Sequence, residues 1–188
     1  PPFGIKLTRE ASGSYESSTL FARDGYPAKR PWFPFTDDVY QEIIPAAAAG
    51  YPYPIKILWL HYGTPALANP AGHLQIKMLQ DPEKIPLFIA TDIVIGESSM
   101  YADYLFPDLS YLERWGNPMG TSPATMTRTT KVRQPVAAPI PEIVTVDGEE
   151  MPISMEAVML AIAKRLRAPG YGKDGFASGR HFNRPEDF

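Results

Sequence analysis

The chain has 188 residues and a formal net charge of −3, so it lacks the basic excess that nucleic-acid binding requires. It contains no cysteine, which excludes disulfides, iron–sulfur ligation and thiolate metal ligands within these residues. It also has no apolar run of about 18 residues, so the sequence predicts neither a transmembrane helix nor direct membrane insertion.

The first part of the chain is expected to be an irregular arm that leads into a short helix and a strand. Residues 1–35 show no hydrophobic period and mix aromatic side chains with proline, glycine and charged residues. Thr36 is predicted to cap the short helix. The run Ile-Lys-Ile-Leu-Trp-Leu at residues 55–60 is typical of a buried strand.

A loop and a second helix follow this strand. The loop has the sequence Tyr-Gly-Thr-Pro at residues 62–65. The helix is predicted near residues 70–80, with Asn69 as its cap and Pro70 at its first position.

Two further strands are predicted to be parallel neighbours. The first is Leu-Phe-Ile-Ala at residues 87–90, which ends at Thr91 and Asp92. The second is Tyr-Leu-Phe at residues 104–106, which is cut by a proline and followed by Asp108. A short helical link joins them. Because ligands of open parallel sheets bind at the carboxyl ends of the strands, the three polar residues are expected at a binding edge.

The remainder of the chain is expected to contain a hairpin and one more helix. Residues 127–133 alternate as an extended segment, and residues 142–151 predict a hairpin that turns on an Asp-Gly pair. An amphipathic helix is predicted at residues 154–166, with Ser154 as its cap. The glycine-rich residues 168–188 predict a weakly structured tail.

Together these elements predict an α/β fold with a small, mainly parallel, Rossmann-like sheet flanked by helices and long irregular arms at both ends. The expected organisation is an N-terminal arm at residues 1–35, an α/β domain at residues 36–167 and a tail or linker at residues 168–188.

No residue pattern in the chain predicts independent catalysis. His61, His73 and His181 are far apart, and no pair has the spacing of metal ligands. The sequence contains no motif of a serine hydrolase, zinc protease or phosphate-binding loop. We therefore expect no catalytic or metal-binding residue here and an isolated chain without activity.

The motifs in combination carry a resemblance that covers most of the chain. Residues 87–116 join the strand, Thr-Asp, a short helix, Ala-Asp-Tyr-Leu-Phe-Pro-Asp and Tyr-Leu-Glu-Arg-Trp-Gly. This pattern resembles the molybdopterin oxidoreductases, and most narrowly the catalytic subunits of tetrathionate reductases, with respiratory arsenate reductases close behind. The segments 25–32, 50–56 and 170–188 fit the same subgroup.

The resemblance implies a molybdenum enzyme of anaerobic respiration, of which this chain would be a fragment. The full enzyme would hold two molybdopterin guanine dinucleotides (bis-MGD) on molybdenum and an iron–sulfur cluster elsewhere in the subunit. It would reduce tetrathionate to thiosulfate; arsenate or another oxyanion is the alternative substrate. A non-catalytic nucleotide-binding or interaction module is the alternative from another class.

The resemblance also implies cofactor contacts at the ends of two strands. The family has a Gly-x-Asn-Pro-like loop after its first strand, and Gly63 and Thr64 stand there in this chain. Threonine keeps one hydroxyl but loses the paired donor and acceptor of asparagine. Thr91 and Asp92 occupy the place of a polar residue and an acid that contact the guanosine. A carboxylate can accept two parallel hydrogen bonds from guanine; alternatively, Asp92 caps the following turn.

Arg114 is the last residue implied as a cofactor contact. Related enzymes carry a basic residue at this place, and its side chain could reach phosphate or ring oxygens of the cofactor. The alternative is an ion pair with Glu113 or Asp108.

The implied partners are the remainder of the catalytic subunit together with an iron–sulfur electron-transfer subunit plus a membrane anchor subunit. The resemblance also implies a periplasmic or cell-envelope location facing outward, which the residues themselves leave unknown.

Overall fold

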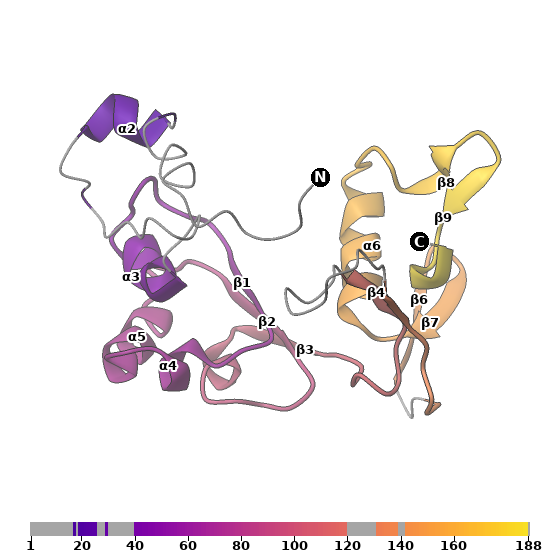
Figure 1. Cartoon of the computed structure of the whole chain (residues 1–188), viewed down its shortest axis with the longest axis horizontal. Coiled ribbons are helices and arrows are strands. Elements are labelled where there is room, and N and C mark those ends of the chain that lie inside the picture. Colours follow the sequence, from indigo (N-terminus) through magenta and orange to yellow (C-terminus); the bar gives the residue numbers. More distant parts are fainter. Residues whose placement is uncertain are drawn as a thin grey trace, which may run out of the picture.

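The computed structural model describes residues 17, 19–25, 29, 40–119, 131–138 and 142–187. They form two lobes that are joined by the chain leaving strand β3 (Figure 1). The first lobe carries a three-stranded sheet and most of the helices, and the second carries one long helix and small hairpins. The helical elements of the first lobe are α2 (Thr19–Asp24), η2 (Tyr40–Glu42), α3 (Ile43–Ala48), α4 (Pro65–Ala68), α5 (Gly72–Leu79) and η3 (Ser99–Tyr101).

The sheet of the first lobe is parallel throughout, as the sequence predicted. Its strands are β1 (Leu58–His61), β2 (Phe88–Asp92) and β3 (Tyr104–Pro107), in the order β1-β2-β3. Strand β1 begins three residues later than the predicted start at residue 55. The α/β class is confirmed, and the central position of β2 explains why its sequence is a continuous apolar run.

The core of the first lobe lies between this sheet and helices α3 and α5. Four buried side chains form its centre, namely Ile44, Leu79, Ile85 and Phe88. Burial of such a side chain stabilises the fold by roughly 1.5–3 kcal/mol relative to exposure.

The corner between α4 and α5 differs from the prediction. Asn69 does not cap the second helix; it closes α4, where its N–H donates to the carbonyl of Pro65 at 2.9 Å. The reason is that Pro65 already starts a helix at its first position, where the fixed φ of proline is favourable. Helix α5 then begins after Ala71, and Gly72 is required because a Cβ there would lie 1.7 Å from the carbonyl oxygen of Ala66.

The second lobe is built around α6 (Met155–Arg165), which packs on the hairpin of β6 (Ile143–Val146) and β7 (Glu149–Pro152). Both the hairpin and the helix were predicted. The hairpin turns at Asp147 and Gly148, whose φ values of 52° and 84° suit a two-residue turn. The buried core of this lobe consists of Val146, Met151, Ala157 and Leu160.

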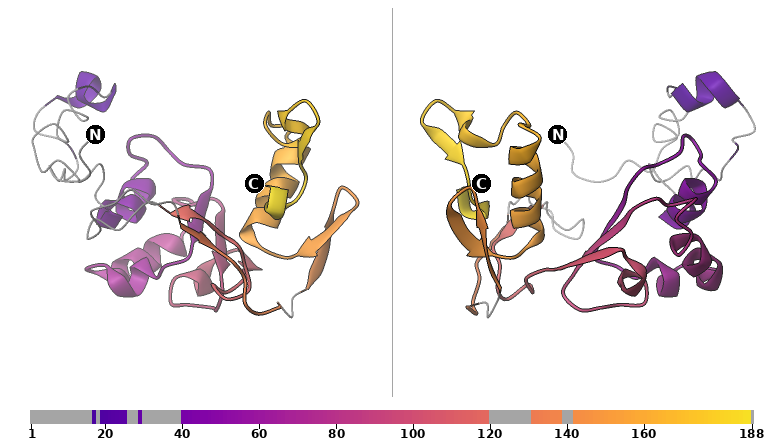
Figure 2. Two further views of the ribbon diagram at one scale, coloured as in Figure 1. Left: turned by 45° about the vertical axis from the view of Figure 1, so that its right-hand side comes forward. Right: turned by 180° about the vertical axis from the view of Figure 1, so that it is seen from behind.

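The prediction of a weakly structured tail is wrong for residues 172–187. Strands β8 (Gly172–Ala177) and β9 (Arg180–Phe182) form an antiparallel hairpin, and the turn η4 (Pro185–Asp187) follows. Figure 2 shows this hairpin next to α6 from two further sides. Tyr171 stacks on Phe182 at 5.3 Å between ring centroids, and both pack against the second core. Aromatic burial therefore orders a stretch that is rich in glycine.

Strand β4 (Gly116–Met119) pairs antiparallel with β5 (Lys131–Arg133), so the extended segment predicted at residues 127–133 is confirmed for residues 131–133. The predicted cap at Thr36, most of the N-terminal arm and residues 120–130 lie outside the described residues. Among the helices that the structure describes, none has the length and apolar character needed to cross a membrane.

Candidate functional site

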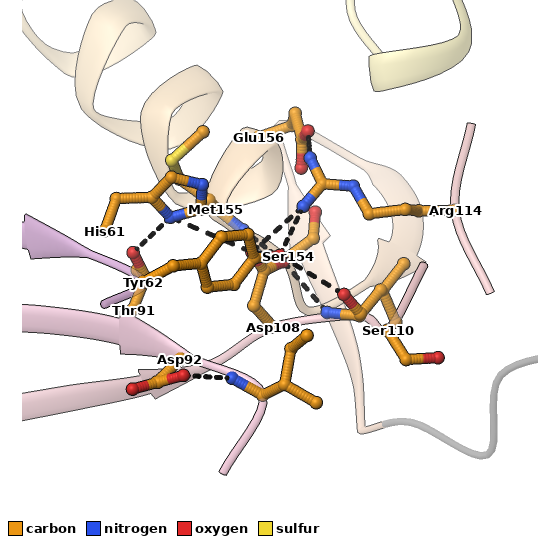
Figure 3. A network of polar contacts seen from close by, with 12 residues as sticks. His61, Tyr62, Thr91, Asp92, Asp108, Ser110, Arg114, Ser154, Met155 and Glu156 are labelled. Atoms are coloured by element: carbon orange, nitrogen blue, oxygen red, sulfur yellow. Dashed lines mark hydrogen bonds and ion pairs between the residues drawn. The ribbon is translucent and has the colours of Figure 1, made fainter. Parts of the chain in front are cut away.

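The three parallel strands end at one edge of the sheet, and polar side chains from all three gather there (Figure 3). Two backbone hydrogen bonds extend the strand pairing into the loops. The N–H of Tyr62 donates to the carbonyl of Thr91 at 3.0 Å, and the N–H of Asp108 donates to the carbonyl of Asp92 at 3.0 Å. The sheet therefore fixes the first residue of the loops after β1 and β3, and Thr91, Asp92 and Asp108 lie at the predicted edge.

Thr91 is fully buried and holds two side chains of β1. The indole N–H of Trp59 donates to its hydroxyl oxygen at 3.3 Å, and Nδ1 of His61 lies 2.8 Å from the same oxygen. Burial lowers the pKa of His61 below its ordinary value of 6.5, which favours the neutral ring. Thr91 thus lies at the predicted edge, but its hydroxyl is occupied within the sheet.

Asp92 uses one carboxylate oxygen and leaves the other open. Its Oδ1 accepts a hydrogen bond from the N–H of Ile93 at 2.9 Å, which is the turn cap raised from the sequence. Its Oδ2 has no hydrogen-bond partner among the residues that the structure describes. This oxygen lies beside Gly96, where an added Cβ would be 3.8 Å away from it. The carboxylate can therefore cap the turn and still accept hydrogen bonds from a ligand.

The loop that carries Gly63 and Thr64 leaves β1 through two residues with positive φ, Tyr62 at 56° and Gly63 at 84°. The carbonyl of Thr64 accepts hydrogen bonds from the first turn of α4, while its side chain makes no capping bond. The loop touches the loop after β2, since a Cβ on Gly96 would lie 2.9 Å from Cγ2 of Thr64. Gly63, Thr64 and Asp92 are thus brought close together, although they are far apart in sequence.

Asp108 is the most densely bonded side chain of the site, and it is fully buried. Its Oδ1 accepts from the N–H groups of Leu109 at 2.9 Å and Met155 at 3.1 Å. Its Oδ2 accepts from the hydroxyl of Tyr62 at 2.7 Å and from Nη1 of Arg114 at 3.0 Å. The sequence placed Asp108 at this edge but did not predict that it ties the sheet to the start of α6.

Arg114 makes the ion pair with Asp108 that was raised as its alternative role. Its Nη1 also donates to the hydroxyl of Tyr62 at 2.8 Å, and its Nη2 pairs with Glu156 on α6. Glu113 does not take part; it accepts from the N–H of Ser110 at 2.9 Å, and hydrogen bonding to the side chain and the backbone of Ser110 lowers the pKa of Glu113. The guanidinium is therefore surrounded by protein partners.

The electrostatics of the edge favour a neutral ligand group that is rich in hydrogen-bond donors. Burial and the bond to Asp108 raise the pKa of Tyr62 to about 12, so its hydroxyl stays protonated. Among the described side chains that meet here, Arg114 is the only full cation, and two carboxylates neutralise it. Asp92 adds an open acceptor. This set suits a base edge or a ribose better than a diphosphate, which would need unpaired cations.

Sequence reasoning missed the roles of His61 and Tyr62. His61 was judged only as a metal ligand, and the described residues contain no group of three histidines or acidic residues that could hold a metal ion. The position of Tyr62 directly before Gly63 was the sequence signal for its role, because the chain has to turn sharply away from the strand there.

No protein-family profile matches the chain. It is 52% identical over 186 residues to a subunit of the selenate reductase from Mesobacillus selenatarsenatis, covering 99% of this chain and 17% of that protein. It is 38% identical over 204 residues to a subunit of the tetrathionate reductase from Salmonella typhimurium, covering 100% of this chain and 19% of that protein. A tetrathionate reductase subunit of Archaeoglobus fulgidus is 37% identical over 174 residues, covering 89% of this chain and 15% of that protein.

Over a shorter stretch of 78 residues, the chain is 36% identical to the molybdopterin-containing subunit of a thiosulfate reductase from Salmonella typhimurium. The chain spans less than a fifth of the length of the three longer matches. All four relatives are named as reductase subunits, but the substrates in their names are selenate, tetrathionate and thiosulfate. The comparison therefore does not single out tetrathionate.

Proposed function

We propose that this chain, which belongs to the molybdopterin oxidoreductase family, forms part of the pocket for the guanine end of one molybdopterin guanine dinucleotide in a reductase catalytic subunit. The observation that carries the proposal is the open Oδ2 of Asp92 at the carboxyl edge of a parallel sheet. Sheets of this kind receive nucleotides at this edge.

The hydrogen-bonding capacity of Asp92 fits guanine. Guanine presents a ring N–H and an amino group side by side, and a carboxylate can accept from both. Oδ2 is open, and Oδ1 keeps a second lone pair after it accepts from the N–H of Ile93. Such charge-assisted bonds are each worth about 1.5–3 kcal/mol.

The surroundings of Asp92 fit the same group. Gly63 and Gly96 carry no side chain that would block the approach of a base, and the hydroxyl of Thr64 can supply one more hydrogen bond. Arg114 does not contact the ligand directly in this proposal, because its guanidinium is hydrogen-bonded to Asp108 and Tyr62.

The redox chemistry would be supplied by molybdenum on the bound bis-MGD, with electrons arriving through an iron–sulfur cluster in another part of the enzyme. This chain's own residues would bind and orient one end of the cofactor. The isolated chain would therefore be inactive.

The substrate we propose is an oxyanion that is reduced by two electrons. Selenate and tetrathionate are the leading candidates because the two relatives that match 99% and 100% of this chain are named as reductases of these compounds. Arsenate is the third candidate. Assays of the complete enzyme with a reduced dye and each oxyanion in turn will rank them. Turnover of none of the three would contradict this part of the proposal.

The complete enzyme is proposed to include the remainder of the catalytic subunit together with an iron–sulfur subunit plus a membrane anchor, and to face outward at the cell envelope. The relatives are named as single subunits of their reductases, which supports the presence of further subunits. The competing proposal is a non-catalytic nucleotide-binding module, which a purified enzyme without molybdenum would favour.

Asp92→Asn tests the guanine contact. The amide turns one acceptor into a donor that would face a donor of guanine, so cofactor affinity should fall roughly ten- to a hundredfold, at 1.4 kcal/mol per tenfold. The measurement is the guanine nucleotide and molybdenum content of the purified enzyme. Glu97→Gln is the matched control because Glu97 is an exposed acid on the same loop. Equal cofactor content in both variants and the wild type would leave Asp92 as a turn cap.

A further inference from the structure

The loop that is proposed to meet the cofactor begins with a residue in an unfavourable backbone conformation. Tyr62 has a φ of 56°, in the left-handed region that bulky side chains rarely adopt. Such a conformation persists only when surrounding contacts hold it. The N–H of Tyr62 donates to the carbonyl of Thr91, and its hydroxyl donates to Asp108 at 2.7 Å and accepts from Nη1 of Arg114 at 2.8 Å.

The acceptor of that hydroxyl is itself held from the second lobe. Asp108 also accepts a hydrogen bond from the N–H of Met155, the first residue of α6. The positive end of the helix dipole at this position favours a carboxylate. Arg114 joins the network from the chain between the lobes and pairs with Glu156 in the first turn of α6. The orientation of the Tyr62 side chain thus depends on contacts made by α6 (Figure 3).

We propose that Asp108 is a positioning residue that, through the hydroxyl of Tyr62, holds the loop of Gly63 and Thr64 in its ligand-binding conformation. This conformation consequently depends on the docking of α6 against the edge of the sheet. The inference rests on the proposed cofactor role of the loop, but the loop geometry can be tested without the cofactor.

A purely structural role for Asp108 would have different consequences. In that case the carboxylate would only join the two lobes, and removing the Tyr62 hydroxyl would leave the loop unchanged because the pair of Asp108 with Arg114 stays intact. Tyr62→Phe separates the two roles, since it deletes one oxygen and keeps the ring and the ion pair.

The experiment compares Tyr62→Phe with the wild type in the complete enzyme. Backbone hydrogen exchange in a peptide covering residues 62–68 reports the loop, the guanine nucleotide content reports the cofactor, and thermal unfolding reports global stability. We expect about tenfold faster exchange and about tenfold weaker cofactor retention, with the unfolding temperature of the core nearly unchanged. Tyr53→Phe, which removes an exposed hydroxyl of the first lobe, is the matched control and should change none of the three.

Two outcomes would overturn the inference. Exchange and cofactor retention equal to the wild type in Tyr62→Phe would show that Asp108 does not position the loop. An unchanged exchange rate in Glu156→Gln would overturn the part assigned to the ion pair between α6 and Arg114, because this substitution leaves the bond from the N–H of Met155 to Asp108 in place. A wild-type enzyme without guanine nucleotide would instead refute the proposed function, while the exchange measurement would still decide the positioning role.

Discussion

Replacing Gly96 with alanine should force apart the two loops that carry the proposed cofactor contacts. An added Cβ would lie 2.9 Å from Cγ2 of Thr64, 3.7 Å from Oγ of Ser99 and 3.8 Å from Oδ2 of Asp92. Carbon atoms are in comfortable contact at about 3.5–4.0 Å, so the loops would have to separate by roughly 0.6–1.1 Å at this point.

Two opposing effects set the size of the change in stability. Overpacking of this kind costs about 1–3 kcal/mol. Alanine also restricts the unfolded chain, which stabilises a protein by about 0.4–1 kcal/mol where the backbone can accept it. Gly96 is not among the glycines with positive φ, so this gain applies. The overpacking is the larger effect, and we expect a net loss of about 1–2 kcal/mol in the free energy of unfolding.

Thr64→Ser provides the matched test because it deletes Cγ2 and keeps the hydroxyl. Denaturant unfolding of the two single variants and the double variant forms a cycle. In the double variant the clash is absent and the gain from alanine remains, so its stability should slightly exceed that of Thr64→Ser alone, with a coupling free energy of about 1–3 kcal/mol, the full cost of overpacking. Additive effects, or a Gly96→Ala variant as stable as the wild type, would refute the close contact of the two loops.

Two further predictions concern the helix cap of the second lobe and the pH dependence of the edge. Ser154→Ala should lower the free energy of unfolding by about 0.5–2 kcal/mol, because the Ser154 hydroxyl accepts a hydrogen bond from the N–H of Ala157 at 3.2 Å. Ser154→Asp, measured alongside by denaturant unfolding, should retain most of the capping stabilisation. Equal losses in the two variants would contradict the capping role of Ser154. Burial lowers the pKa of the His61 imidazole, so as the pH falls the unfolded chain takes up a proton before the folded chain does. The contribution of His61 to the free energy of unfolding is therefore complete above about pH 6.5 and is lost as the pH falls through the folded-state pKa. His61→Asn should therefore flatten the pH dependence of unfolding between about pH 7.5 and 5, and an unchanged slope would count against a partly buried, neutral His61.

Elements whose signals are local were predicted correctly from the sequence. The apolar run before Thr91 and Asp92 identified β2, and the polar residues that follow the strands were correctly placed together at one edge of the sheet. The hairpin turn at Asp147 and the cap at Ser154 were equally clear, because turn and cap residues act on their own neighbours. The placement of Asp92 required only the order of the elements.

Contacts between distant segments were decided only by the tertiary structure. Tyr62 and Asp108 are 46 residues apart, and Asp108 and Met155 are 47 apart, so no periodicity or motif relates them. The sequence left the partner of Arg114 open for the same reason. It also predicted a weakly structured tail, because glycine lowers local propensity, whereas the stacking of Phe182 depends on a core built by other segments. Propensity describes a residue and its neighbours, while a buried carboxylate takes its partners from whichever elements the fold brings to it.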